Sequence, residues 1–140
     1  MGYGTNKKKM QSFISKNKIS KNVKIIDFQK NPYKFLKKSN LFILTSLYEG
    51  LPNVLLEAMV LKKFIISSNC PTGPREILAN GKLGSLFNTQ NIKDLSNKIL
   101  NFNYNIYENN KITQRAFKSL ARFDFNINCE EYFKIIKKFI

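Results

Sequence analysis

Two carboxylates, Glu49 and Glu57, stand on either side of a stretch whose residue types suit anion binding. Pro52 lies between them and favours the first position of a helix, because its missing N–H would have no partner there. The N–H groups of Asn53 and Val54 would then lack partners within the helix and would lie at the positive end of its dipole. Such a helix start can bind a phosphate, and the flanking carboxylates can accept hydrogen bonds from hydroxyl groups on either side of it.

The elements around this stretch alternate between short apolar runs and helical patterns. The apolar runs predict buried strands over residues 23–28, 41–45 and 64–67, and a short last strand after a turn within 81–87. Helical spacing predicts helices over residues 6–17, 32–39 and 52–61, and a short helical piece over 76–78. This alternation favours right-handed βαβ units and a parallel sheet with helices on both faces. Ligands of such sheets bind beyond the carboxyl ends of the strands, where the turns after the strands meet.

Beyond residue 88 the pattern is helical. Asn91 and Asp94 have the spacing of a capping box at the start of a helix. That helix is expected to turn one apolar face inward: Ile92, Leu95, Ile99 and Leu100. A second helix is expected over residues 108–123, with four side chains inward: Ile112, Ala116, Phe117 and Leu120.

A last helix, opened by Asn128 and Glu131, carries an apolar stripe on a basic background. The stripe consists of Tyr132, Ile135, Ile136, Phe139 and Ile140, and the basic residues are Lys134, Lys137 and Lys138. A basic amphipathic helix can lie on a membrane. Because a stripe at this spacing more often belongs to a core, we favour packing of this helix on the domain.

The segment Tyr48-Glu-Gly-Leu-Pro-Asn-Val-Leu-Leu-Glu-Ala-Met59 resembles the E-x7-E signature of retaining family 4 glycosyltransferases of the GT-B fold. The match continues through Pro-Thr-Gly-Pro-Arg-Glu-Ile-Leu at 71–78 and Asn-Gly-Lys-Leu-Gly-Ser-Leu at 80–86. Two glutamates at this spacing alone would be a weak signal, but the segments together are specific. The resemblance implies an α/β fold with a Rossmann-like parallel sheet and flanking helices, as part of a GT-B C-terminal domain.

The resemblance also implies how the chain is organised. We expect a single, N-terminally incomplete nucleotide-sugar-binding domain, with an α/β part over residues 1–88 and C-terminal helices over 89–140. The implied activity is transfer of a sugar, with retention, from a nucleotide diphosphate sugar to an acceptor hydroxyl, in polysaccharide or glycoconjugate synthesis. A UDP-sugar is one candidate donor, and no other cofactor is implied. The acceptor site is expected on a separate N-terminal half.

The family's functional residues map onto the opening stretch. By resemblance, Glu49 would be the catalytic residue that holds hydroxyls of the donor sugar, and Glu57 would hold the ribose hydroxyls of the nucleotide. The backbone at Gly50, Leu51, Asn53 and Val54 would bind the diphosphate.

Three further residues are candidates outside that stretch. Arg75 lies in a loop that faces the donor in the family, where a guanidinium can pair bidentately with phosphate, although a plain surface arginine fits equally well. Phe28 and Gln29 are candidates for contact with the nucleotide base. Asp27 stands where the family usually has glycine, which weakens that assignment.

Composition excludes several kinds of site. The chain has no histidine, which excludes Ser-His-Asp catalysis and a histidine-ligated metal within it, and its few aspartates form no Asp-x-Asp motif. We therefore expect no metal site. The two cysteines, Cys70 and Cys129, do not indicate a disulfide scaffold. No apolar run is long enough to span a membrane, so we expect a cytoplasmic protein, with the inner face of the membrane as an alternative place.

The net charge of +15 keeps a second class of function open. A basic chain can bind nucleic acid or an anionic membrane, but lysine is abundant throughout this sequence, so we interpret the charge as a solvated surface and expect no nucleic-acid partner. Three hypotheses follow: a donor-binding half of a glycosyltransferase, active only with a separate N-terminal half; a basic binding module; and a remnant without activity.

Overall fold

The structure is a computed structural model that describes residues 4–139. It divides into two compact units, Met1–Phe35 and Leu36–Ile140. The first unit holds helix α1 (Lys7–Lys16), and helix α2 (Tyr33–Lys38) crosses from the first unit into the second. Both helices end within one residue of the predicted spans. No residue of α1 is buried, and its apolar residues Met10 and Phe13 are exposed.

The predicted strand over residues 23–28 is wrong. This segment has no regular secondary structure, and only Ile25 and Ile26 in it are half-buried. The residue types suit a strand, but a strand exists only where a neighbour supplies partners for its backbone N–H and C=O groups. Among the described residues, no ladder pairs this segment with another strand.

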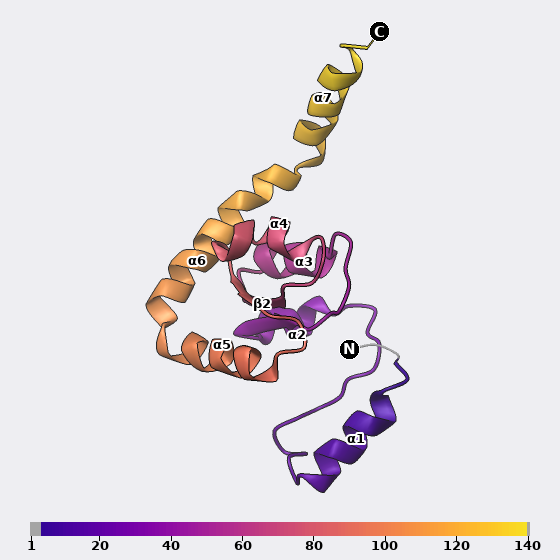
Figure 1. The fold of residues 1–140 in the computed structure, drawn as a ribbon, viewed down its shortest axis with the longest axis vertical. Coiled ribbons are helices and arrows are strands. Elements are labelled where there is room, and N and C mark those ends of the chain that lie inside the picture. Colours follow the sequence, from indigo (N-terminus) through magenta and orange to yellow (C-terminus); the bar gives the residue numbers. More distant parts are fainter. Residues whose placement is uncertain (1–3, 140) are drawn as a thin grey trace. The chain divides into compact units, whose positions relative to one another are not determined.

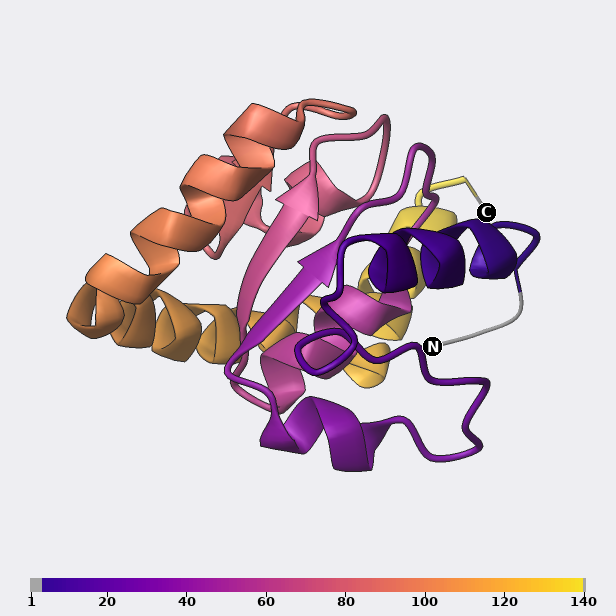
Figure 2. The ribbon, with the colours of Figure 1, turned by 90° about the horizontal axis from the view of Figure 1, so that it is seen from below.

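The second unit is built on a parallel sheet of three strands. The strands are β1 (Leu41–Leu44), β2 (Phe64–Ser68) and β3 (Ser85–Phe87), in the order β1-β2-β3. Leu41 pairs with Phe64 and Ile66 with Ser85. Figure 2 shows β1 and β2 side by side, with their arrows pointing the same way. The strands confirm the predicted parallel sheet.

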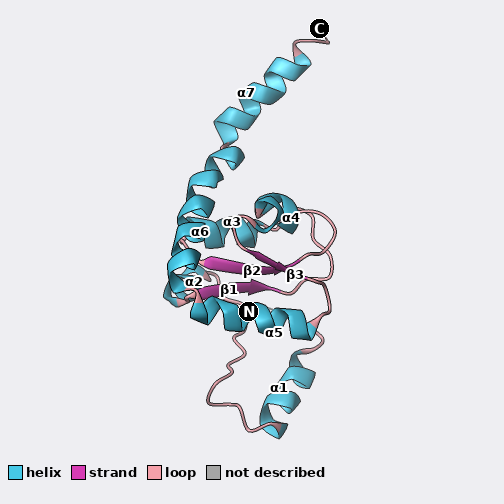
Figure 3. Ribbon diagram, turned by 60° about the vertical axis from the view of Figure 1, so that its left-hand side comes forward, coloured by secondary structure: helices cyan, strands magenta, loops and turns pink. Residues whose placement is uncertain are grey.

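The two faces of the sheet are covered by different helices, as Figure 3 shows. Side chains of successive strand residues point to opposite faces, so Ile65 of β2 enters one core while Phe64 and Ile66 enter the other. The Ile65 core is closed by helix α3 (Asn53–Val60) and by helix α4 (Pro74–Ile77). Every residue of β2 is buried, as expected for the central strand of a parallel sheet.

The sequence predicted α3 and the turn after α4 closely. α3 buries Leu55, Ala58 and Met59, which lie at helical spacing on the face toward the sheet. A short 3-10 helix, η1 (Ala79–Gly81), connects α4 to β3. The short helix begins at Pro74, two residues before the predicted start at Glu76, because proline suits the first helical turn.

Helix α5 (Ile92–Tyr104) covers the other face of the sheet. Its capping box is only half formed: the Asn91 side chain accepts a hydrogen bond from the N–H of Asp94 (3.0 Å), but the Asp94 carboxylate accepts from the N–H of Asn88. Leu95 and Ile99 pack on the sheet as predicted. Two members of the predicted inward face are exposed instead, Ile92 at 80% and Leu100 at 52%.

Helix α6 (Ile106–Lys118) and the 3-10 helix η2 (Ser119–Phe123) form the predicted second C-terminal helix, with a tighter last turn and an earlier start. Ala116 is buried, and Ile112 and Leu120 pack against the two cores. Phe117 is 39% exposed, and the Lys62 ammonium lies 4.7 Å from the centre of its ring.

Helix α7 (Phe125–Ile136) departs from prediction in two ways. It begins at Phe125, because the Asp124 carboxylate caps it by accepting hydrogen bonds from the N–H groups of Asn126 and Ile127. Asn128 lies inside the helix. The predicted packing of its stripe is also wrong: α7 has no buried residue and extends beyond the helices around the sheet (Figure 1).

The exposed stripe comprises Tyr132, Ile135 and Ile136 of α7 and Phe139 beyond its end, which are 52–85% exposed. Ile140, the last member of the predicted stripe, lies outside the described residues. An amphipathic pattern fixes which face of a helix is apolar, but it does not fix what covers that face. In the described part of the chain, no helix is long and apolar enough to cross a membrane.

The burial pattern of α3 gives a first testable prediction. Leu55→Ala should lower the free energy of unfolding by about 2–5 kcal/mol, because Leu55 is fully buried between α3 and the sheet and the change leaves a cavity. Val60→Ala on the same helix should cost far less, since Val60 is 54% exposed. Urea unfolding followed by circular dichroism measures both, and equal losses would contradict the assigned core.

Candidate functional site

The candidate site lies where β1, β2 and β3 end. Because the strands are parallel, the loops that follow Leu44, Ser68 and Phe87 all leave the same edge of the sheet. Hydrogen bonds join these loops. The Ser68 hydroxyl donates to the carbonyl oxygen of Ser46 (2.6 Å), and the Asn69 N–H donates to that of Phe87 (2.8 Å). The edge is therefore a connected set of loops.

The loop after β1 is held by the loop after β2. The Thr72 hydroxyl donates a hydrogen bond to the carbonyl oxygen of Glu49. Gly73 packs against Gly50 so closely that a Cβ atom on Gly73 would lie 2.1 Å from the Gly50 carbonyl oxygen and 2.5 Å from Cδ of Pro52. Gly73 also has a φ of +75°, a conformation that favours glycine. Only glycine fits there without moving one of the two loops.

This contact fixes the start of α3. Pro52 is buried and occupies the N-cap position of α3. The helix therefore begins at Asn53, one residue later than predicted. Its carbonyl oxygen accepts from the N–H of Leu55 (2.9 Å), and no side chain caps the helix. The N–H groups of Asn53 and Val54 precede this first intrahelical bond, so they lack helical partners. Both residues are exposed, and N–H groups without helical partners at the positive end of a helix can bind an anion.

The two glutamates flank that helix start. Glu49 lies in the turn before it and Glu57 one turn into α3, and both are half-buried. Among the described residues, neither carboxylate accepts a hydrogen bond or forms an ion pair, so each can accept hydrogen bonds from a ligand. Gly50 and Leu51 lie between Glu49 and Pro52 and are exposed. The structure thus brings six predicted site residues into one loop and helix turn.

Arg75 lies at the start of α4, next to the same loop. Its Nε donates to the Asn69 side chain (3.1 Å), which leaves the other guanidinium N–H groups for a ligand. With Thr72, Glu76 and Arg122 it lines a shallow cavity of about 590 Å³. Arg122 comes from the 3-10 helix η2, more than forty residues further along the chain. Its Nη2 donates to the Ile77 carbonyl oxygen (2.9 Å), which fixes its position.

The base-binding candidates belong to the other compact unit. Gln29 donates from its side-chain amide to the Phe28 carbonyl oxygen (3.1 Å), and Phe28 is 57% exposed. Asp27 accepts from the Lys7 ammonium. A role for Phe28 and Gln29 in binding a base stays a prediction.

Sequence reasoning did not single out Thr72 and Gly73 as site residues. Both act on the neighbouring loop, because the Thr72 hydroxyl donates to the Glu49 carbonyl oxygen and the missing side chain of Gly73 lets the Gly50 turn approach. The available signal was a glycine between Thr72 and Pro74 in a loop rich in turn formers. The cysteine of this loop, Cys70, is buried and free, and the exposed Cys129 is free as well.

Comparison with known proteins connects this edge to a family. Residues 1–119 match the family model for glycosyl transferases group 1. A 78-residue stretch is 51% identical to an uncharacterised glycosyltransferase of Methanocaldococcus jannaschii, and covers 56% of this chain and 19% of that protein. Over 121 residues the chain is 31% identical to a poly(ribitol-phosphate) alpha-N-acetylglucosaminyltransferase of Staphylococcus aureus, covering 86% of this chain and 24% of the relative.

Solved structures give the same fold. The crystal structure of TarM matches 94% of this chain and 26% of its own, with a TM-score of 0.83 and 25% identity. Anabaena Alr3699/HepE in complex with UDP-glucose matches 98% of this chain and 39% of its own, with a TM-score of 0.84 and 20% identity. The chain spans less than a third of the length of the first two curated relatives. Its matched residues and its fold agree: the chain belongs to the glycosyl transferases group 1 family.

Proposed function

We propose that this chain forms the donor site of a glycosyltransferase that transfers a sugar from a nucleotide diphosphate sugar to an acceptor hydroxyl, with retention at the anomeric carbon. The observation that carries the proposal is the uncapped start of α3 at the carboxyl edge of the sheet, with unpaired Glu49 and Glu57 on either side. An anionic diphosphate suits the helix start, and the hydroxyls of two sugars suit the two carboxylates.

Each residue then has a defined role. The N–H groups of Leu51, Asn53 and Val54 hold the diphosphate beside Gly50, which leaves the turn unobstructed. Donors already in place stabilise the negative charge that grows on the leaving diphosphate, which is electrostatic catalysis.

The remaining assigned residues contact the other parts of the donor. Glu57 accepts from the ribose hydroxyls, and Glu49 accepts from hydroxyls of the transferred sugar. Arg75 adds charge beside the phosphates. Phe28 and Gln29 contact the base, and neither a metal ion nor another cofactor takes part.

The relatives support a role in cell-surface glycans. Their names include a lipopolysaccharide 1,6-galactosyltransferase of Salmonella typhimurium and a capsular polysaccharide biosynthesis glycosyltransferase of Staphylococcus aureus. Neighbouring structures are described in complex with UDP and UDP-glucose, which makes a UDP-sugar the first donor to test. The chain spans about a quarter of the length of two of these proteins. We propose an N-terminal half as the partner that brings the acceptor, and the inner face of the membrane as its place.

Nucleotide binding tests the role of Glu57. UDP should bind the chain, and Glu57→Ala should weaken binding at least about tenfold, because hydrogen bonds to a charged group contribute about 1.5–3 kcal/mol. Isothermal titration calorimetry measures both affinities. Glu130→Ala is the matched control, since Glu130 lies exposed on α7, far along the chain. Unchanged UDP affinity in the Glu57 variant would refute the assignment.

The loop contact gives a second prediction. Gly73→Ala should also weaken UDP binding, because its Cβ would displace the Gly50 turn and with it the start of α3. Gly4→Ala is a suitable control, since a Cβ there meets no atom within 4 Å. Circular dichroism checks that the variant folds. A folded Gly73 variant with wild-type UDP affinity would mean that the turn does not shape the site.

One observation favours a second function, binding to an anionic membrane. The apolar stripe of α7 is exposed, and three lysines, Lys134, Lys137 and Lys138, lie on the same segment. A basic amphipathic helix of this kind can bury its apolar face in the interface of a bilayer. This function is compatible with a donor site at the sheet edge.

Vesicle binding tests this second function. The chain should sediment with vesicles that contain phosphatidylglycerol and not with phosphatidylcholine alone, and salt should weaken the binding. Ile136→Asp should abolish sedimentation, whereas Asn126→Asp on the same helix should reduce it only slightly. Equal sedimentation of the two variants would show that the stripe does not contact the bilayer.

A further inference from the structure

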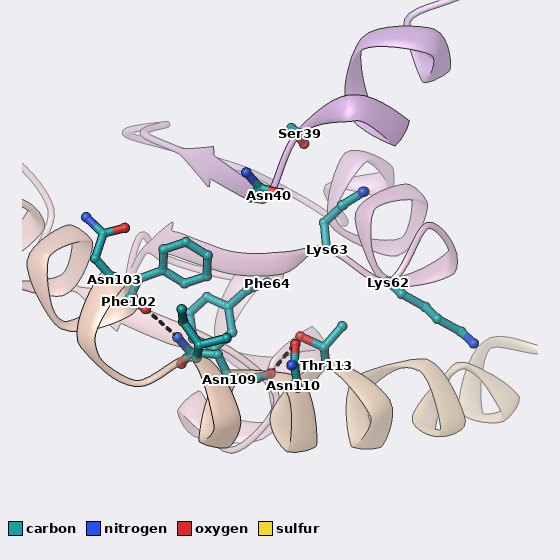
Figure 4. A pocket seen from close by; sticks show the side chains of 11 residues that line it. Ser39, Asn40, Lys62, Lys63, Phe64, Phe102, Asn103, Asn109, Asn110 and Thr113 are labelled. Carbon is teal, nitrogen blue, oxygen red and sulfur yellow. Dashed lines mark hydrogen bonds between the residues drawn. The ribbon is translucent and has the colours of Figure 1, made fainter.

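A second cavity lies at the opposite edge of the sheet from the candidate donor site. It has a volume of about 470 Å³ and lies where β1 and β2 begin, between the ends of α3 and α5 and the start of α6. Its volume falls within the range of small-molecule sites. Figure 4 shows its lining side chains. Nothing in the donor-site assignment uses these residues.

Amide side chains dominate the polar lining of this cavity. Asn40 directly precedes β1, Asn103 lies on α5, and Asn109 and Asn110 lie on α6. Asn109 is 7% exposed and donates from Nδ2 to the Phe102 carbonyl oxygen (2.8 Å), which fixes its position. In the described part of the chain, the amides of Asn40, Asn103 and Asn110 make no side-chain hydrogen bond.

The apolar part of the lining is aromatic. The rings of Phe64 and Phe102 lie 5.3 Å apart between centroids and are inclined by 35°. In Figure 4 the two rings lie side by side, with Asn103 on α5 and Asn109 on α6. The cavity therefore combines an aromatic surface with side chains that both donate and accept hydrogen bonds.

The cations of the cavity are already engaged. The Lys63 ammonium donates to the carbonyl oxygen of Lys37 (2.7 Å), and the Lys62 ammonium lies over the ring of Phe117. Figure 4 shows the Lys62 side chain extending away from the amide groups. A neutral ligand thus matches the available groups better than an anion does.

We propose that this cavity is a second ligand site, which binds a neutral saccharide. Each sugar hydroxyl both donates and accepts a hydrogen bond, as each amide does, and the C–H groups of a sugar ring can pack on an aromatic ring. Asn40, Asn103 and Asn110 contact the hydroxyls, and Phe102 contacts the ring. The site is independent of the donor assignment, because the two sites share no residue.

Nuclear magnetic resonance on the whole chain tests the proposal. The 15N-labelled protein is titrated with N,N′-diacetylchitobiose, a neutral disaccharide, in the presence of excess UDP. The side-chain amide resonances of Asn103 and Asn110 should shift on addition of the disaccharide. A parallel titration with inorganic phosphate should not move them.

Two variants locate the binding. The double variant Asn103→Ala and Asn110→Ala should weaken disaccharide binding about tenfold or more, by loss of two hydrogen-bonding side chains. Both residues are exposed on helices where alanine is favourable, so the fold is retained. Asn97→Ala, also exposed on α5 but outside the cavity, should bind as the parent does.

Three results would overturn the proposal. One is no shift of the Asn103 and Asn110 resonances at millimolar disaccharide. The second is equal affinity of the double variant and Asn97→Ala. The third is displacement of the disaccharide by phosphate, which would make the cavity an anion site. Failure of UDP to bind would refute the donor assignment alone and leave these readouts unaffected.

Discussion

The close approach of Gly73 to the carbonyl oxygen of Gly50 is the contact on which the candidate donor site depends. Two loops from neighbouring strands meet backbone to backbone there, and the Thr72 hydroxyl closes the contact with a hydrogen bond to Glu49. The turn that carries Glu49 is thus held in place by the loop that follows β2. A side chain at residue 73 would separate the loops, so the conformation of the turn depends on the absence of one Cβ atom.

Burial on the sheet fixes the other half of the site. Leu55, Ala58 and Met59 anchor α3 by one face, which leaves Asn53 and Val54 exposed at its start. Fixed donors need no reorganisation when they meet a charged group, and this makes them effective for binding and for stabilising developing charge. The core packing of α3 and the ligand chemistry at its N-terminus are therefore properties of one rigid element.

The sequence allowed the sheet and α3 to be predicted, because local residue types decide their structure. The buried run of β2 and the spacing of Leu55, Ala58 and Met59 depend on short-range patterns. The site residues were predicted from the resemblance around Glu49 and Glu57. The structure places six of them in one loop and helix turn, and their roles stay a prediction. The shift of Pro52 by one position follows from its compatibility with both the N-cap and the first helical turn.

Two of the failures have a common physical cause, because long-range partners decide them, and the third is a choice between two local caps. Residues 23–28 have strand composition but no paired neighbour, so they form no strand. Asp124 and Asn128 are both residue types that cap helices. Asp124 caps α7, because its carboxylate accepts from the free N–H groups of the first turn, whereas the Asn128 side chain donates to the Arg122 carbonyl oxygen. Ile92 and Leu100 fit the apolar period of α5, but they lie outside the part of the helix that packs on the sheet.

Charge acts on this molecule in two ways that differ in range. The chain has a net charge of +15, and its described part contains only two ion pairs. Most lysines therefore have no acidic partner and produce a positive field in the solvent. Such a field speeds the approach of an anion such as the proposed donor and is screened by salt over about 8–10 Å. The N–H groups at the start of α3 act only on contact. If the proposed donor binds, salt should therefore slow its association more than it speeds its dissociation, because only the first step depends on the distant lysines.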